Sequence, residues 1–170
     1  NRLQQLVQYC CQQENFGYTT SDFPLAKLDQ ETLDQVFGKN RNIEDIYPLT
    51  PMQKGILFGT LYTLETDAYM TQALYEFKGN FHQQVLQDAW RKVMNHYSIL
   101  RTAFLWKDLS SPHQFISKFS NLKWLYHNFK EIPKEDLDNQ LKHLIDSDRK
   151  NPFNLSEAPL SRQHWIEIDK

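Results

Sequence analysis

The sequence predicts an α/β fold in which helices lie over a mostly antiparallel sheet. Segments with apolar residues at helical spacing alternate with short segments rich in β-branched and aromatic residues, and turn residues separate the two kinds. The chain has 170 residues, of which 40% are hydrophobic and 14% aromatic, so it can bury one sizeable core. The predicted order of elements is helix, strand, long helix, strands, helix, strand.

The first part of the chain predicts two helices joined by turn residues. A second, short helix takes Asp29 as its N-cap and ends at Gly38, with Leu33, Val36 and Phe37 facing inward. The cysteines are adjacent and have no second pair, so neither a CxxC zinc site nor a disulfide framework is expected. The first helix covers residues 1–13, and its apolar stripe consists of Leu3, Leu6, Val7, Cys10 and Cys11.

The next helix has a well-defined start. Thr50 is its predicted N-cap, Pro51 occupies the first helical position, and Gln53 completes a capping box. Residues 69–79 follow, with apolar and polar residues in alternation, and predict a half-buried strand.

The second half of the chain predicts a long helix, three strands, a helix and a last strand. Residues 81–100 form the most strongly amphipathic segment. A helix opens at Pro133 and ends before Pro152, and the last strand covers residues 159–170. The three strands between the helices, expected to be antiparallel, are residues 101–108, 113–119 and 122–129.

Charge and motif content exclude several classes of function. With 19 basic and 21 acidic side chains and no basic cluster, neither nucleic acid nor an anionic membrane is an expected partner. No membrane-spanning stretch or signal peptide is apparent, which predicts a cytoplasmic location. The sequence has no GxSxG, Walker, GxGxxG or HExxH motif. The six histidines show no close pairing on one helix face and suggest no metal site, and acidic residues such as Asp146 and Asp148 are expected on a solvated helix face.

Two segments carry a specific resemblance. Residues 43–61, IEDIYPLTPMQKGILFGTL, resemble the first core motif of the condensation domains of nonribosomal peptide synthetases, in the form Ser/Thr-Pro-Met-Gln-x-Gly. Residues 95–104, NHYSILRTAF, resemble the second, Arg-His-x-x-Leu-Arg-Thr-x-Phe, but have His96 and Tyr97 in place of the usual arginine and histidine. The matching residues are Thr50, Pro51, Met52, Gln53, Gly55, Leu100, Arg101, Thr102 and Phe104.

The resemblance implies a fold and a division of the chain. The fold is the two-layer sandwich of chloramphenicol acetyltransferase, with residues 43–170 as the amino-terminal lobe of a condensation domain. Residues 1–42 are then the tail of an upstream domain and a linker, and their TTSDFP stretch resembles the end of an epimerization domain. The Pro-Met-Gln-x-Gly form resembles the branch whose donor ends in a D-residue.

The resemblance also implies the reaction, which is amide bond formation between a peptidyl donor and an aminoacyl acceptor. Both are carried as phosphopantetheine thioesters by carrier proteins, so those proteins and adjacent synthetase domains are the expected partners, and no cofactor is bound directly. The family's catalytic signature, His-His-x-x-x-Asp-Gly, does not occur in this sequence and is expected after Lys170 together with the second lobe. No catalytic residue is therefore assigned here, and the chain alone is expected to be inactive or nearly so.

Arg101 lies in an otherwise apolar run and needs either a route to water or an anionic partner. In the family it pairs with the aspartate of the signature, which implies that it is a structural brace of the catalytic loop. The alternative is an arginine at a helix end that reaches solvent. The resemblance further implies that Tyr47 and Met52 line the substrate tunnel, whereas the capping box gives Gln53 a purely structural explanation.

Two other functions remain open at this point. The chain could be a noncatalytic module of acyltransferase-like fold that docks carrier proteins or neighbouring domains. It could also be the first lobe of an epimerization domain, which shares the fold, although the linker and the Leu-Arg-Thr-x-Phe form favour condensation. A heterocyclization domain would carry Asp-x-x-x-x-Asp in place of the His-His signature.

Overall fold

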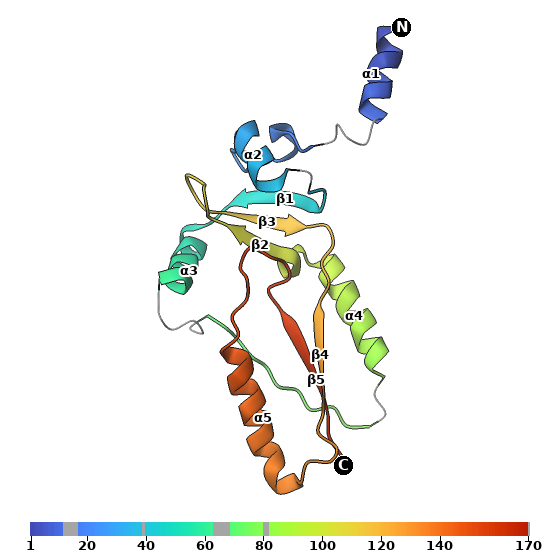
Figure 1. Cartoon of the computed structure of the whole chain (residues 1–170), viewed down its shortest axis with the longest axis vertical. Coiled ribbons are helices and arrows are strands. Elements are labelled where there is room, and N and C mark those ends of the chain that lie inside the picture. The colour runs from blue at the N-terminus through green and yellow to red at the C-terminus, as the bar shows by residue number, and fades with distance from the viewer. Residues whose placement is uncertain (12–16, 39, 63–68, 80–81, 170) are drawn as a thin grey trace.

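A computed structural model describes the chain except for residues 12–16, 39, 63–68, 80–81 and 170 (Figure 1). It contains two separate small sheets with helices beside them. The elements in chain order are α1 (Arg2–Cys11), the 3-10 turn η2 (Thr20–Asp22), α2 (Gln30–Phe37), β1 (Ile43–Pro48), α3 (Pro51–Tyr62), α4 (Gln83–His96), the 3-10 turn η3 (Ser98–Arg101), β2 (Thr102–Leu105), β3 (His113–Ser117), β4 (Lys123–Asn128), α5 (Lys134–Arg149) and β5 (Arg162–Glu167).

The first sheet is antiparallel and has the strand order β1-β3-β2. Its edge strand β1 was not predicted as a strand, because its buried residues Ile43 and Ile46 are three positions apart and break the alternation that marks a strand. The structure gives the reason: the register shifts between Ile43 and Asp45, so one extra residue, Glu44, is inserted as a bulge.

The second sheet pairs β4 with β5 in parallel. The expectation that residues 122–129 join an antiparallel set was therefore wrong for this strand. The reason lies in the connection, because α5 runs between β4 and β5 and makes the three elements a βαβ unit. The predicted order of strand, helix and strand in this region was the sequence signal for a parallel pair.

The strand predicted for residues 69–79 is absent from the structure, which has no regular secondary structure in this segment. A strand needs a partner edge, and this segment instead contacts α5 through a side chain. Gln72 donates hydrogen bonds to Ile145 O at 3.1 Å and to Asp148 Oδ2 at 2.8 Å. The alternating apolar side chains that suggested a strand, Ala73, Tyr75 and Phe77, are all exposed.

The predicted start and stop of α2 agree with the structure. Asp29 caps α2 by accepting a hydrogen bond from Thr32 N, and Gly38 follows the last turn with φ = 48°. The long helix is shorter than predicted, since α4 ends at His96 and η3 continues to Arg101.

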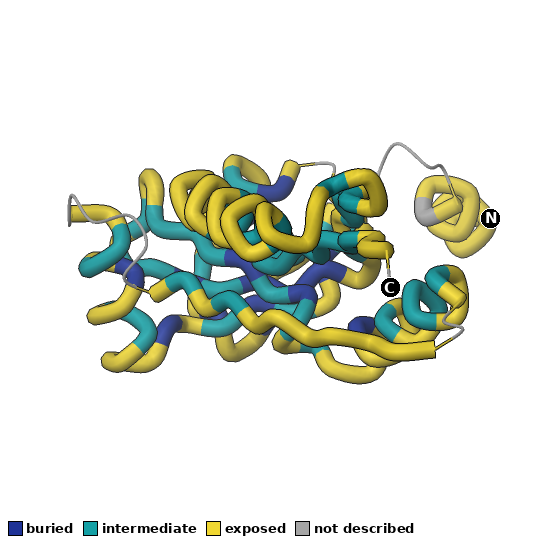
Figure 2. Tube along the Cα trace, turned by 90° about the horizontal axis from the view of Figure 1, so that it is seen from below, coloured by how far each residue is buried: buried dark blue, intermediate teal, exposed yellow. Residues whose placement is uncertain are grey.

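The hydrophobic core lies between the three-stranded sheet and the segment that precedes it in the chain. Figure 2 shows that α1 is exposed wherever its side chains are described. The core cluster consists of Phe23, Ala26, Leu33 and Phe37 from before β1, and of Ile43, Ile46, Ala103 and Phe115 from the sheet.

Candidate functional site around Arg101

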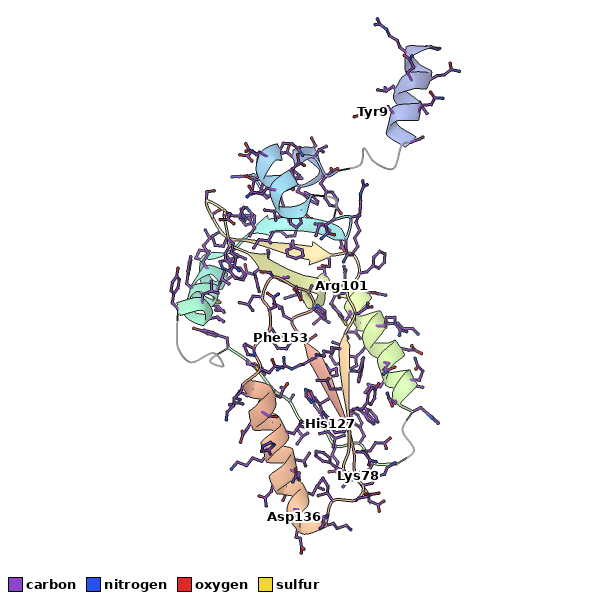
Figure 3. All side chains as sticks on the ribbon, viewed as in Figure 1. Tyr9, Lys78, Arg101, His127, Asp136 and Phe153 are labelled. Carbon is purple, nitrogen blue, oxygen red and sulfur yellow. The ribbon has the colours of Figure 1, made fainter. Side chains whose placement is uncertain are left out.

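Arg101 is a buried cation whose partners lie within the chain (Figure 3). Its side chain is 5% exposed, and Nη1 lies 2.5 Å from Oε2 of Glu44. The guanidinium also donates to three backbone carbonyls: Nε to Met94 O at 2.8 Å, and Nη1 to Ser117 O and, at 3.3 Å, to Lys118 O. The interpretation in which this arginine reaches solvent is therefore wrong.

Local structure explains each of these contacts. α4 ends at His96, so the carbonyl of Met94 belongs to its last turn, where no intrahelical donor is available. η3 turns the chain back and places Arg101 against this carbonyl, where a cation also complements the negative end of the helix. The bulge in β1 directs Glu44 toward Arg101, as bulges often redirect a side chain.

The network joins four elements through one side chain: α4, η3, the bulge of β1 and the end of β3. A buried guanidinium is expensive to desolvate, and the carbonyls and the carboxylate compensate for that cost. Glu44 keeps 45% of its side chain exposed, so the anionic side of the pair remains close to solvent. The predicted role of Arg101 as a brace for a catalytic loop remains a prediction.

Residues of the first motif form the start of α3. Thr50 N donates to Gln53 Oε1 at 2.9 Å and Gln53 N donates to Thr50 Oγ1 at 3.3 Å, which confirms the predicted capping box. Gln53 Nε2 also donates to Gln114 Oε1 at 3.1 Å, so the same side chain ties α3 to β3. Pro51 is the first residue of the helix, and a Cβ at Gly55 would meet no atom within 4 Å.

Residues of the second motif lie around Arg101, in η3 and β2. Thr102 Oγ1 donates to Ser98 O at 3.1 Å and closes the turn. Phe104 N donates to Leu155 O at 2.8 Å, which attaches the outer edge of β2 to the loop after α5. Leu100 is half-buried.

The two residues predicted to line a tunnel lie on either side of the start of α3. Tyr47 is half-buried in β1 and its hydroxyl donates to Asp45 Oδ2; this hydrogen bond, with burial and the nearby negative charges, raises the pKa of the phenol. Met52 is 76% exposed in the first turn of α3. Their assignment to a tunnel remains a prediction.

A polar cluster around Asp148 was not foreseen from the sequence, which suggested a solvated carboxylate. Asp148 Oδ1 accepts from Arg162 Nε at 2.5 Å and from His164 Nε2 at 3.0 Å, and Arg162 Nη2 donates to the backbone oxygen of Asp148 at 2.7 Å. The Arg162 guanidinium stacks over the ring of Phe153 at 4.5 Å. Burial alone raises the pKa of Asp148, but hydrogen bonds from Arg162 and Gln72 and the charges of Arg162 and His164 outweigh it and lower the pKa.

A histidine pair that lies on two strands, and not on one helix face, adjoins this cluster. His127 Nε2 and His164 Nδ1 are 3.0 Å apart, and the rings are parallel within 2°. Burial, together with the positive charge of His164, lowers the pKa of His127. When both rings are neutral, His164 donates from Nε2 to Asp148, so His127 must donate to His164 Nδ1. Only the parallel pairing of β4 with β5 brings these residues together.

No group of three or more metal-binding side chains occurs among the described residues. Within the same residues, no helix is both long enough and apolar enough to cross a membrane.

Comparisons with known proteins agree with this geometry. The family model for the condensation domain matches residues 43–170. The chain is 38% identical over 98% of its length to one protein of the linear gramicidin synthase of Brevibacillus parabrevis, and 38% identical over 96% to a second protein of the same synthase. It spans only 2% and 3% of the length of these two relatives.

Solved structures show the same fold at low sequence identity. The starter condensation domain of rhizomide synthetase superposes with a TM-score of 0.55 at 17% identity, covering 73% of this chain and 28% of that one. The structure is thus a mixed α/β lobe of the acetyltransferase-like type that the sequence predicted.

Proposed function

The chain belongs to the condensation domain family, and from this premise we propose that it takes part in amide bond formation by a nonribosomal peptide synthetase. The amine of an aminoacyl group on one carrier protein attacks the thioester carbon of a peptidyl group on another. A C–N bond forms, the C–S bond breaks, and the proton lost by the amine ends on the released thiol of the donor's phosphopantetheine. The observation that carries this proposal is the family match over residues 43–170.

In this proposal the 170 residues supply the amino-terminal lobe and not the catalytic base. The sequence contains neither a His-His nor an Asp-Gly dipeptide, so this proposal places the family signature outside these 170 residues. General acid and base catalysis contributes about 100- to 10,000-fold to such reactions. The 170 residues by themselves are expected to transfer little or no peptide.

We assign Arg101 the role of a positioning residue that holds the loop of that signature. Its burial and its hydrogen bonds to Met94 O and Glu44 support the assignment, because they fix the orientation of the guanidinium in advance. The bonds found in the described part of the chain use Nε and Nη1, which leaves Nη2 for a carboxylate. A guanidinium binds a carboxylate with a defined geometry that an ammonium group cannot reproduce.

The partners in this proposal are a peptidyl and an aminoacyl carrier protein and the adjacent domains of the synthetase, in the cytoplasm. The phosphopantetheine belongs to the carriers. A donor that ends in a D-residue, and an epimerization domain upstream, complete the proposal on the basis of the Pro-Met-Gln-x-Gly and TTSDFP stretches.

The test uses the complete condensation domain in its parent synthetase, with both carriers loaded. Arg101→Lys should lower the single-turnover rate of peptide transfer about 100-fold, the size expected for a misplaced reacting group, while donor carrier binding stays unchanged. Arg91→Lys is the matched control, because Arg91 is an exposed arginine of α4 paired with Asp88. Wild-type transfer by a folded Arg101→Lys variant would contradict the assigned role. Carrier binding without transfer in the wild-type domain would instead indicate a noncatalytic docking module.

A further inference from the structure

Residues 18–37, here called the strap, precede the part of the chain that matches the condensation family. We propose that the strap is an integral part of the lobe, docked in cis on the three-stranded sheet, and that the upstream part of the chain is attached to the lobe at Tyr18 instead of at residue 43. This inference concerns the physical boundary of the lobe and is independent of the reaction proposed above.

Apolar burial is the first argument. Half of the core cluster comes from the strap and half from the sheet, so neither part has a complete core without the other. Phe37 and Phe115 pack edge to face with their ring centroids 5.6 Å apart, a geometry that aromatic pairs prefer. Phe23 is 4% exposed and Leu33 is 2% exposed, although neither lies in the family match.

Hydrogen bonds at the free edge of β1 are the second argument. The hydroxyl of Tyr18 donates to Ile43 O and accepts from Ile43 N, both at 2.9 Å, so it satisfies the two backbone groups that an edge strand leaves open. Gln30 Nε2 in turn donates to Tyr18 O at 2.9 Å and fixes the start of the strap. Lys118, at the end of β3, lies over the Tyr18 ring at 5.6 Å.

A buried polar contact ties the middle of the strap to β3. His113 is 3% exposed, and its Nε2 lies 2.8 Å from Ala26 O. Its Nδ1 lies 2.9 Å from Ser111 O. Buried polar groups are costly unless they are paired, so loss of the strap would remove one of the two carbonyl oxygens that face this ring.

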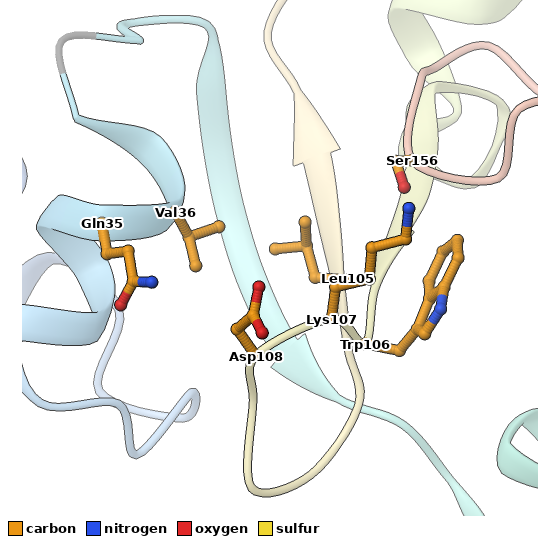
Figure 4. A pocket seen from close by; sticks show the side chains of 7 residues that line it. All are labelled: Gln35, Val36, Leu105, Trp106, Lys107, Asp108 and Ser156. Carbon is orange, nitrogen blue, oxygen red and sulfur yellow. The ribbon is translucent and has the colours of Figure 1, made fainter.

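A pocket of about 260 Å³ lies between the strap and the three-stranded sheet (Figure 4). Val36 and Gln35 of α2 form one wall, and the end of β2 with the turn after it forms the other, including Leu105 and Asp108. Upstream of the strap the situation is different. Leu3, Leu6 and Val7 of α1 are all more than half exposed, so the shared core does not extend to that helix.

Tryptophan fluorescence offers a clean test, because all four tryptophans lie after residue 42, at positions 90, 106, 124 and 165. Urea unfolding of the full chain, followed by this signal, therefore reports on the lobe and not on the strap. Phe23→Ala should lower the midpoint by about 1 M urea or more, because it opens a cavity in the shared core. Leu25→Ala, an exposed position two residues away in the same turn, is the matched control and should leave the midpoint unchanged.

A milder pair of variants covers the case in which Phe23→Ala does not fold. Phe37→Leu and Phe115→Leu, alone and together, test the contact across the seam. If strap and sheet form one cooperative unit, the double variant should shift the midpoint by less than the sum of the single shifts. A tryptophan-monitored midpoint that is the same for Phe37→Leu, Leu25→Ala and the wild type would overturn the proposal.

Discussion

The two sheets of this lobe are held in different ways. The three-stranded sheet and the strap share a cluster of side chains with almost no exposure, whereas β4, α5 and β5 contain no buried residue at all. The second unit contains instead a cluster of ionic and histidine contacts centred on Asp148, whose side chain is 11% exposed. Apolar burial responds little to pH, while contacts between titratable groups do. The comparison therefore separates a part of the lobe that sets its stability from a part that makes its stability sensitive to conditions.

Arg101 is the charged exception within the apolar region and should have the largest effect. Arg101→Met leaves several buried carbonyls without a donor and Glu44 without its cation. We expect a loss of about 3 kcal/mol in the free energy of unfolding. Chemical denaturation measures it, with Arg91→Met as the control that should show no measurable change because its ion pair is exposed. An Arg101→Met variant as stable as the wild type would mean that the network is dispensable.

Asp148 is the corresponding centre of the second unit. Asp148→Asn keeps the shape of the side chain but removes the charge that Arg162 and His164 contact. The expected loss is about 2 kcal/mol, the usual value of a hydrogen-bonded charge contact. Asp146→Asn, on an exposed position of the same helix, is the control. Equal stability of the two variants would remove the distinction drawn between the two sheets.

Stability should fall when the pH is lowered from 7 to about 5.5. The folded chain holds the pKa of His127 below its ordinary value of 6.5, so the unfolded chain binds more protons as the pH passes through 6.5. The contribution of His127 to the free energy of unfolding is complete above pH 6.5 and is lost progressively below it. Denaturation midpoints across this range should vary less in His127→Gln than in the wild type. His82→Gln, at an exposed histidine, should keep the wild-type profile.

Asp148 adds a second, more acidic phase. Its pKa is lowered in the folded chain, so the stability that it contributes is present above its unfolded pKa of 3.8 and is lost as the pH falls further. In Asp148→Asn this phase should be absent while the His127 phase remains visible. A single acid transition that is unchanged in both variants would show that other groups control the response.

The smallest effect is expected at the cap of α3. Thr50→Ala removes the hydroxyl that accepts from Gln53 N and should cost about 1 kcal/mol. Thr50→Ser retains the hydroxyl and is the control. The Gln53 contact to Gln114 should persist in both variants, since it does not involve Thr50.

Features of this lobe that depend only on residues a few positions apart in the sequence could be predicted from the sequence. The caps at Asp29 and Thr50 and the start of α5 after Pro133 are of this kind. Strand β1 was missed because the bulge at Glu44 removes the alternation of buried and exposed residues. Residues 69–79 have that alternation but lack a partner strand in the structure, so the pattern alone was misleading.

The candidate site also divides into features that the local sequence predicts and features that it does not. The motif residues and the buried arginine were identified in advance, but Glu44 as its anion was not, since 57 residues separate the two in sequence. The link from His127 to His164 to Asp148 was missed for a similar reason, because it depends on the parallel register of β4 and β5. Contacts between distant segments follow from topology, and no local pattern encodes them.

The position of the strap also bears on how the protein emerges from the ribosome. β1 pairs only with β3 among the described strands, and β3 begins at residue 113, long after β1 has been synthesised. Until then the backbone of β1 has no sheet partner, and Ile43 and Ile46 would face water. The strap is made immediately before β1, and its Tyr18 and Phe37 can cover this strand as soon as it appears. Domains fold from the amino terminus during synthesis, and early cover of an unpaired strand protects the nascent chain against aggregation.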